Sequence, residues 1–258
     1  MRAGDRGRAF PDIVPAGGDT ATPLNLRKRL RFLGRHGAVA GARLLDCGCG
    51  AGEYVVALRQ AGVEALGVEF QAEKVARARA SGVPTDWVLR ADLEQLPYAD
   101  HSFDAALLNE VLEHVPDERR ALAEVWRVLR PGGALIVLSP NRLYPFETHG
   151  VSLRQSGRAL PPSIPLIPYI PLSLGRKLFH YWARNYWPGE LADLVRSAGF
   201  ELTTQGFLWQ TFENISGRQP GLIAATRPFW RAVAAAGERL PVVRRLGPSQ
   251  AVVAAKPG

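Results

Sequence analysis

A glycine-rich turn constrains this chain more than any other part of its sequence. The segment 46–52 reads DCGCGAG, and it lies between an apolar run that starts at Ala42 and a helical pattern that starts at Glu53. Three glycines let a backbone bend sharply and approach a ligand, because no Cβ stands in the way. The sequence therefore predicts a strand, a ligand-binding turn and a helix in succession, as at the start of a nucleotide-binding βαβ unit.

The charges beside this turn indicate which kind of ligand it binds. A dinucleotide site has Gly or Ala three residues after the second glycine of its motif, and Glu53 stands at that position here. A carboxylate at the start of the helix would repel a diphosphate, and Asp46 adds a second negative charge. S-adenosylmethionine (SAM) carries an ammonium and a sulfonium and has no phosphate. We therefore expect SAM, with a dinucleotide-dependent oxidoreductase as an alternative.

Short apolar runs that alternate with helical patterns predict an α/β fold. Strands are expected at 42–48, 64–70, 85–92, 103–110 and 133–141, and helices at 53–61, 72–80 and 118–129, the last closed by Pro131-Gly132-Gly133. A further helix at 188–200 and strands at 201–210 and 249–257 follow. Right-handed crossovers place such helices on both faces of one sheet. We predict a Rossmann-like, seven-stranded, mostly parallel sheet with helices on both faces.

One domain with two insertions accounts for the 258 residues of the chain. Residues 1–22 show no apolar period and are expected to form a flexible tail, ahead of a single domain at 23–258. A basic, amphipathic helix over 23–36 is expected to cover the cofactor cleft. Insertions are expected at about 142–187 and 211–248. The first is rich in proline and is predicted to form a partly helical cap over the substrate.

The first insertion also allows other interpretations. Its segment 160–187 combines apolar and aromatic side chains with Arg176, Lys177 and Arg184, a mixture that suits the boundary between membrane and water. Peripheral membrane contact and an ordinary subdomain core are therefore alternatives to a lid. No apolar run reaches the roughly 20 residues that span a bilayer, and residues 1–18 lack the apolar core of a secretory signal. We expect a cytoplasmic protein, with peripheral attachment to a membrane as an option.

Further blocks of sequence resemble one protein family. DCGCGAG is followed by LNEVLEHV at 108–115 and EVWRVLRPGGALIV at 124–137. In this order and spacing, the blocks resemble class I SAM-dependent methyltransferases (methyltransferase type 11) of the kind found in ubiquinone and menaquinone biosynthesis. The similarity covers about 44–141. It implies SAM as the cofactor and transfer of a methyl group as the activity.

The resemblance also implies a set of cofactor-binding residues. Glu69 would hold both ribose hydroxyls with its two carboxylate oxygens, and Phe70 would pack on the adenine. Asp92 would accept a hydrogen bond from the adenine amino group, with the Leu93 backbone amide close to the ring, and Asn109 would lie beneath the methyl donor. The ten residues implied to bind SAM are Asp46, Gly48, Cys49, Gly50, Gly52, Glu69, Phe70, Asp92, Leu93 and Asn109.

A general base is required when the methyl acceptor is a hydroxyl that must lose its proton. His149 is the best candidate, because it follows the fifth expected strand, and the carboxyl ends of such strands form the ligand crevice. His114 could also reach the cleft, although we expect it to pack locally. Neither a disulfide nor a metal site is expected, because Cys47 and Cys49 are too close for a disulfide and no histidines stand near them.

The sequence predicts methylation of oxygen or carbon on a small-molecule, lipid-linked or glycan-linked acceptor. The net charge of +8 favours anionic partners without naming one. Methyltransferases that act on amino groups of nucleic acid bases usually carry an N/D-P-P-Y motif after the fourth strand, where this chain has Asn109-Glu110-Val111-Leu112. A nucleic-acid methyltransferase is therefore an alternative, as is a non-catalytic SAM-binding regulatory protein.

Overall fold

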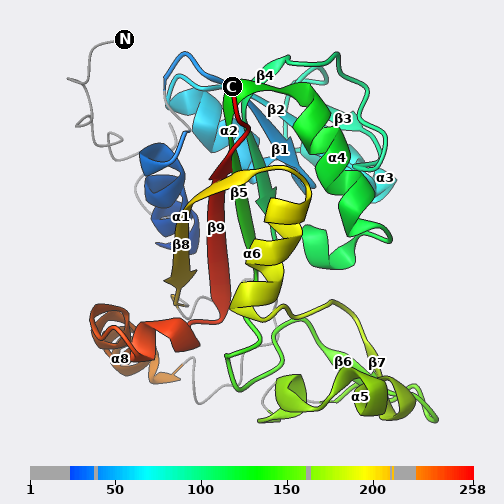
Figure 1. Cartoon of the computed structure of the whole chain (residues 1–258), viewed down its shortest axis with the longest axis vertical. Helices are drawn as coiled ribbons and strands as arrows, with labels where there is room; N and C mark the ends of the chain where they lie inside the picture. Colours follow the sequence, from blue (N-terminus) through cyan, green and yellow to red (C-terminus); the bar gives the residue numbers. More distant parts are fainter. Residues whose placement is uncertain (1–23, 38–39, 161–163, 210, 212–224) are drawn as a thin grey trace.

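Seven strands form one sheet in the computed structural model, which describes residues 24–37, 40–160, 164–209, 211 and 225–258 (Figure 1). The predicted tail at 1–22 lies outside the described residues. The strands are β1 (Arg43–Cys47), β2 (Glu64–Glu69), β3 (Val88–Arg90), β4 (Phe103–Asn109), β5 (Leu129–Pro140), β8 (Glu201–Leu208) and β9 (Ser249–Ala255).

The sheet has the order β3-β2-β1-β4-β5-β9-β8. All pairs from β3 to β5 are parallel, whereas β9 runs antiparallel to both of its neighbours. This arrangement confirms the predicted Rossmann-like, mostly parallel sheet. Its carboxyl-terminal edge, where β1, β2 and β4 end, is the edge at which open α/β sheets bind their ligands.

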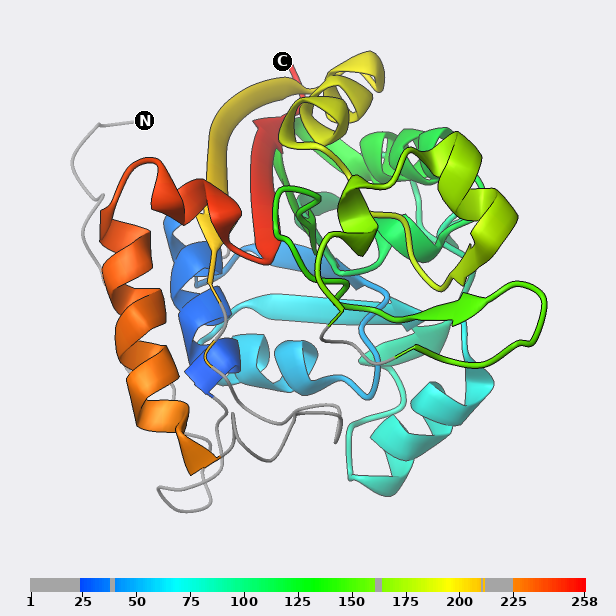
Figure 2. The same cartoon turned by 90° about the horizontal axis from the view of Figure 1, so that it is seen from below.

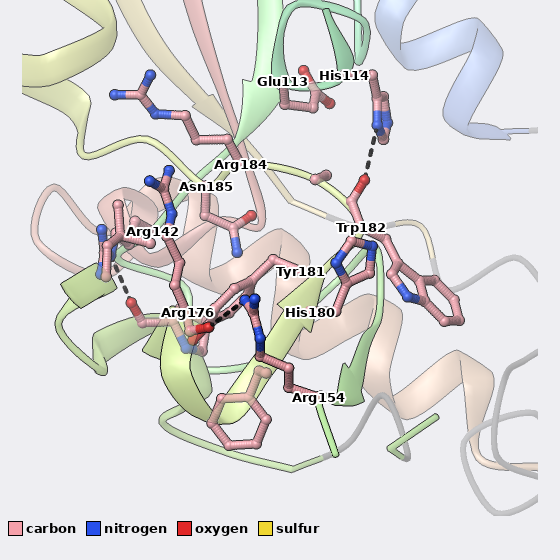
Figure 3. A pocket seen from close by; sticks show the side chains of 14 residues that line it. Glu113, His114, Arg142, Arg154, Arg176, His180, Tyr181, Trp182, Arg184 and Asn185 are labelled. Carbon is pink, nitrogen blue, oxygen red and sulfur yellow. Dashed lines mark hydrogen bonds between the residues drawn. The ribbon is translucent and has the colours of Figure 1, made fainter. Parts of the chain in front are cut away.

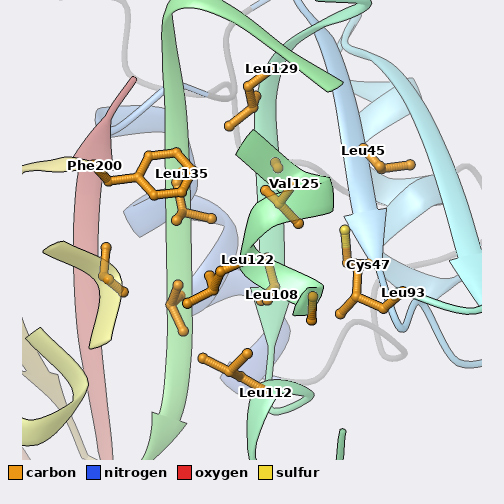
Figure 4. Packing of buried hydrophobic residues seen from close by; sticks show 14 of the residues in the cluster. Leu45, Cys47, Leu93, Leu108, Leu112, Leu122, Val125, Leu129, Leu135 and Phe200 are labelled. Atoms are coloured by element: carbon orange, nitrogen blue, oxygen red, sulfur yellow. The ribbon is translucent and has the colours of Figure 1, made fainter. Parts of the chain in front are cut away.

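Helices cover both faces of the sheet, as predicted. On one face lie α1 (Leu24–Arg35), α2 (Glu53–Gln60) and α3 (Ala72–Ala80), and on the other lie α4 (Glu118–Val128) and α6 (Pro188–Ser197) (Figures 1 and 2). Each face has its own apolar core, and Figure 4 shows the one beneath α4. Helices α2, α3 and α4 lie between successive strands of the parallel part of the sheet, and the carboxyl ends of these strands carry the groups described below.

Neighbouring residues of one strand belong to different cores. Leu44 packs with the residues of α1 and α2, and Leu45 packs beneath α4. In β4, Leu107 and Leu108 divide between the two faces in the same way, and all four leucines are fully buried. Successive side chains of a strand point to opposite faces, so a strand buried on both faces is apolar throughout. This explains why the central strands read as continuous apolar runs.

The first insertion contains helical structure, as predicted, and also a β-hairpin that the sequence did not predict. The strands β6 (Val151–Leu153) and β7 (Phe179–Tyr181) pair antiparallel, with α5 (Leu172–Leu178) and a 3-10 turn, η2 (Ile167–Tyr169), between them. In Figure 1 these elements lie beyond the carboxyl ends of β4 and β5. Strands of three residues are too short to show the alternation that identifies a strand in sequence.

The second insertion includes an amphipathic helix, α8 (Arg227–Arg239), followed by a 3-10 turn, η3 (Val243–Leu246). A third 3-10 turn, η1 (Leu112–His114), follows β4. None of the helices described is both long and apolar enough to cross a membrane.

Several predicted boundaries were wrong by a few residues. The strand predicted over 85–92 spans only Val88–Arg90, and the helix predicted over 188–200 ends at Ser197. The helix predicted over 118–129 ends at Val128, and the strand predicted from Gly133 already begins at Leu129. Leu129 pairs with Phe103 of β4, and a shift of register separates this pair from the regular ladder that continues at Ala134. The Pro-Gly-Gly segment is therefore an irregular part of the strand that lies beyond the end of the helix.

Candidate functional site

The glycine turn between β1 and α2 has a backbone that favours glycine at three positions. Gly48, Gly50 and Gly52 have φ angles of 71°, 61° and 85°, a region that other residues adopt at a cost. A Cβ on Gly48 would overlap the side chain of Val111. On Gly50, a Cβ would meet only Glu53 Oε2, 3.7 Å away, among the described residues. Gly48 is therefore needed for packing, whereas Gly50 leaves the backbone open to a ligand.

Glu69, at the end of β2, fixes this turn against the neighbouring strand. Its side chain is almost fully buried, and Oε2 accepts a hydrogen bond from the Gly50 backbone N–H at 3.0 Å. Oε1 accepts another from the Gln71 N–H at 2.9 Å. A carboxylate has about four lone-pair positions, so these two bonds leave acceptor capacity on both oxygens. The geometry therefore allows Glu69 to bind two further donors.

Asp46 is a buried carboxyl that lacks a hydrogen-bond partner for one oxygen. It is 1% exposed, and Oδ2 has no partner among the described residues. Burial, and then the charges of Glu53 and Glu69, raise the pKa of Asp46 well above its ordinary value. A cationic ligand beside the turn would reduce the repulsion among these three carboxyl groups. The residues of the turn thus fit SAM, which carries two cationic groups.

The other predicted cofactor-binding residues follow the ends of adjacent strands. Phe70 is 64% exposed directly after β2, and Leu93 is buried after β3. Asp92 lies on the surface, where its Oδ1 accepts a hydrogen bond from the Glu94 N–H at 2.9 Å. All of them lie at the carboxyl-terminal edge of the sheet, but only Glu69 is hydrogen-bonded to the glycine turn. Their roles toward SAM stay predictions.

Cys49 is buried within the turn. Its thiol lies against Gly67 of β2, where a Cβ would approach the sulfur to 2.5 Å. Burial, and then the charge of Asp46, raise the pKa of Cys49, so the thiol is protonated at neutral pH. Cys49 therefore contributes shape to the turn and no charge.

Helix α1 attaches to the end of β4 through one arginine. Arg29 donates from Nη1 to Asn109 Oδ1, and from Nη2 to Glu110 Oε1 at 2.8 Å and to Ser249 Oγ at 3.2 Å. Tyr54 of α2 also bonds to the Asn109 side chain. Asn109, predicted to lie beneath the methyl donor, is therefore held in place by α1 and α2 together.

Two histidines and two glutamates gather just beyond β4. These residues, called the His-Glu cluster below, are Glu110, Glu113, His114 and His149. His149 Nε2 lies 3.6 Å from Glu113 Oε1 and 3.8 Å from Glu110 Oε2, and the His149 and His114 rings meet edge to face at 5.2 Å between centroids. His149 Nδ1 lies 3.1 Å from Thr148 Oγ1. The cluster gathers groups that can take up, hold and release protons.

The pKa values of the two glutamates in the cluster are shifted in opposite directions. Burial opposes ionisation of Glu110, but its interactions with Arg29 and His149 and the hydrogen bond from Ser249 outweigh burial, so the pKa of Glu110 is lowered. For Glu113, burial and then the charge of Glu110 raise the pKa well above the ordinary value. The two pKa shifts thus favour a negative charge on Glu110 and a proton on Glu113.

The sequence prediction missed three groups at this site. Glu110 and Glu113 lie within the block LNEVLEHV but were not singled out, and Arg29 was part of the predicted helix without a role. His114 was expected to pack locally, whereas its ring contacts His149. The spacing of Glu110 and Glu113 around the short turn η1 was a usable signal. Nothing in the sequence indicated that Arg29 pairs with a residue 81 positions away.

Comparison with known proteins places this site in a family. A family model described as a methyltransferase domain matches residues 45–137. A "probable S-adenosylmethionine-dependent methyltransferase" of Mycolicibacterium smegmatis is 30% identical over 207 residues, or 77% of this chain and 70% of the relative. A ubiquinone biosynthesis O-methyltransferase of Chromobacterium violaceum is 30% identical over 180 residues, which cover 68% of this chain and 72% of that protein.

Solved structures agree on the fold. A SAM-dependent methyltransferase from Mesorhizobium loti aligns with a TM-score of 0.53 at 22% identity, over 84% of this chain and 92% of the other. A second SAM-dependent methyltransferase, from Archaeoglobus fulgidus, aligns with a TM-score of 0.53 at 20% identity, over 90% of this chain and 93% of the other. The glycine turn, the acidic residues around it and these relatives lead to one conclusion: the chain belongs to the class I SAM-dependent methyltransferases, and SAM is its cosubstrate.

Proposed function

We propose that this methyltransferase transfers the methyl group of SAM to a hydroxyl oxygen of a small-molecule or lipid- or glycan-linked acceptor. The observation that supports oxygen over carbon is His149 at the carboxyl-terminal edge of the sheet, within 4 Å of two glutamates. A hydroxyl acceptor needs a base, and an imidazole is the side chain best suited to that task near neutral pH. Relatives named as ubiquinone biosynthesis O-methyltransferases support the same choice.

In this proposal the turn and the strand ends bind SAM. Asp46, Gly48, Cys49, Gly50 and Gly52 form the turn against which its amino acid part lies, and Asp46 offers the unpartnered oxygen to a cation. The free acceptor positions of Glu69 take the ribose hydroxyls. Phe70, Asp92 and Leu93 surround the adenine, and Asn109 lies beneath the methyl group. These assignments are supported by the shared edge of the sheet on which all ten residues lie.

The chain's task in the reaction is to align two atoms and move one proton. SAM supplies a methyl carbon already activated by a positive sulfur, so the rate depends mainly on how the acceptor oxygen is placed. His149 accepts the hydroxyl proton as that oxygen attacks, and it becomes an imidazolium. The carboxylate of Glu110, 3.8 Å from Nε2, then stabilises the new positive charge.

The substitution His149→Gln tests the proposed base. We expect turnover to fall by about a hundredfold or more, because a positioned general base contributes about that much, while the dissociation constant for SAM stays nearly unchanged. Calorimetry measures SAM binding, and transfer of labelled methyl groups into a cell extract measures turnover. His36→Asn, at the far end of α1, is the matched control.

Three results of this experiment separate the hypotheses. If the His149→Gln variant keeps its turnover, His149 is not the general base. A wild-type chain that binds SAM but labels nothing is a non-catalytic SAM-binding protein. Label that is found only in nucleic acid supports the nucleic-acid methyltransferase that the sequence left as an alternative.

We also propose that the first insertion, 142–187, caps the substrate site and contacts a membrane peripherally through about 160–187. Leu174 and Leu178 of α5 are 51% and 48% exposed, and Trp182 is 39% exposed. Exposed apolar side chains beside the basic Lys177 suit the surface of an anionic bilayer. Sedimentation with phosphatidylglycerol vesicles tests this contact, and Leu174→Ser with Leu178→Ser should release the protein. Equal sedimentation of the variant would rule out this surface.

A further inference from the structure

A cavity of about 360 Å³ lies between the first insertion and the turn that follows β4 (Figure 3). Glu113 and His114 line one end of it, and Arg154 lies at the opposite end. Because Glu113 and His114 also belong to the His-Glu cluster, a molecule in this cavity would extend to the place where we propose methyl transfer. The chemistry of the wall therefore bears on the chemistry of the acceptor.

Arg142 brings a buried positive charge to this wall. It is 6% exposed, and it donates from Nε to the Pro168 carbonyl at 2.6 Å and from Nη2 to the Ile170 carbonyl at 2.9 Å. Its guanidinium also lies over the Trp187 ring, 5.2 Å from the centroid. No carboxylate of a described residue forms an ion pair with Arg142. A buried charge without a counter-charge is costly, so an anion in the cavity would be stabilised here.

Arg154 and Arg176 add two further positive charges at the outer end. They come from the loop after β6 and from α5, and the Arg154 Nη1 donates to the Arg176 carbonyl at 3.0 Å. Both side chains are exposed, and neither forms an ion pair with any residue that the structure describes. Three guanidinium groups that lack a carboxylate partner in the described chain thus surround one cavity.

A fourth arginine in the same wall, Arg184, is neutralised by carboxylates of the fold. Arg184 pairs with Glu118 at 2.7 Å and also with Glu190, so its charge is balanced within the fold. Arg142, Arg154 and Arg176 lack such partners within the described chain. The difference indicates that Arg184 stabilises the insertion, whereas the other three are available to a ligand.

The cavity wall also holds an unused hydroxyl. Tyr181 Oη is buried and has no hydrogen-bond partner among the described residues. A Cβ on Gly175 of α5 would overlap this oxygen, so the glycine makes room for it. A buried hydroxyl without a partner is unfavourable, and a ligand oxygen in the cavity would satisfy it.

We infer that the acceptor carries an anionic group, a carboxylate or a phosphate ester, which this cavity binds through Arg142, Arg154 and Arg176. Guanidinium groups bind both anions through paired, charge-assisted hydrogen bonds. The basic end would hold the anion, and the opposite end would present the methyl-accepting atom to the His-Glu cluster. As a substrate site the inference rests on the proposed methyl transfer, but the binding of an anion can be measured without it.

Calorimetry of the full chain with SAM tests the inference, with phenyl phosphate and benzoate as anionic probes and phenol as the neutral probe. The test variant is Arg154→Gln with Arg176→Gln, two exposed residues of the wall. The control is Arg158→Gln with Arg239→Gln, two exposed residues outside the wall that change the net charge equally. Arg176→Gln alone serves as the second, milder variant.

We expect at least one anionic probe to bind the wild type more tightly than phenol. Its affinity should fall about tenfold or more in the Arg154/Arg176 variant, because charge-assisted hydrogen bonds are lost, and stay within about twofold in the control. Equal losses in both double variants, or phenol that binds as tightly as the tighter-binding of the two anions, would overturn the inference. Displacement of the probe by phosphatidylglycerol vesicles would identify a lipid as the source of the phosphate, and its absence a free anion.

The test of anion binding can fail or succeed independently of the test of methyl transfer. A chain that binds an anion through these arginines but methylates nothing contradicts the proposed function and leaves the inference intact. A chain that methylates neutral hydroxyl compounds, with no effect of the arginine substitutions on affinity or on KM, supports the proposed function and overturns the inference.

Discussion

At the scale of single residues, Glu69 combines a structural bond with a predicted contact to the cofactor. Its two oxygens already accept the Gly50 and Gln71 N–H groups. Glu69→Ala should weaken SAM binding by about 1 to 3 kcal/mol, because the ribose hydroxyls and these N–H groups lose their acceptor. Calorimetry measures the change, and Glu73→Ala on the exposed side of α3 is the control. An unchanged dissociation constant would argue against the ribose assignment.

Glu113 predicts a dependence of stability on pH. Its pKa in the folded chain is raised well above the ordinary value, so above about pH 4.3 the unfolded chain releases this proton while the folded chain retains it. Because of the Glu113 carboxyl, the free energy of unfolding should therefore fall as pH rises. Glu113→Gln keeps the shape and removes the titration.

We expect Glu113→Gln to be more stable than the wild type at pH 8, and the difference to shrink towards pH 4. Urea unfolding at several pH values measures it. A difference that is constant with pH would contradict the raised pKa of Glu113.

The residues of the site differ in how far the sequence could predict them. Gly48 and Gly50 follow from a local motif, because their function depends on backbone conformation within a few positions. Glu69 lies 19 positions from Gly50, and its role was predicted only from the resemblance to a family. The pair of Arg29 and Glu110 joins residues 81 positions apart, and the single sequence contains no signal of that contact. Arg142 could be noticed in sequence only as one of many arginines, since its burial depends on how the insertion folds.

At the scale of elements, the glycine turn offers a direct comparison of strain and packing. Gly48→Ala should cost about 1 to 2 kcal/mol for the positive φ and about 1 to 3 kcal/mol more for the overlap with Val111. Gly82 has a similar φ of 83°, with no atom within 4 Å of a Cβ among the described residues. Gly82→Ala should therefore lose only the stability that the positive φ costs, about 1 to 2 kcal/mol. Chemical unfolding of both variants measures this, and equal losses would contradict the packing role of Gly48.

The central strands and flanking helices could be predicted because their apolar patterns are long and regular. The run Phe103–Asn109 is apolar along most of its length because both faces of β4 are covered. The hairpin of β6 and β7 could not be predicted, because its strands have three residues each and pair across 25 intervening residues. Regular structure in the insertion therefore depends on tertiary contacts more than on local sequence preference.

At the scale of the whole molecule, one edge of the sheet gathers the groups that we assign to SAM binding and to methyl transfer. The glycine turn follows β1, Glu69 ends β2, and the His-Glu cluster lies beyond β4. The turn is acidic and suits a cation, whereas the cavity in the insertion is basic and suits an anion. This opposition of charge within a chain of net charge +8 would keep the cosubstrate and the acceptor in separate places.

Binding of SAM, measured by calorimetry in parallel with NADH, tests the central claim that an acidic glycine turn selects a cationic nucleoside and rejects a diphosphate. We expect the purified chain to bind SAM, Glu69→Ala to weaken this binding, and NADH to produce no heat of binding. A chain that takes up NADH and ignores SAM would contradict this claim.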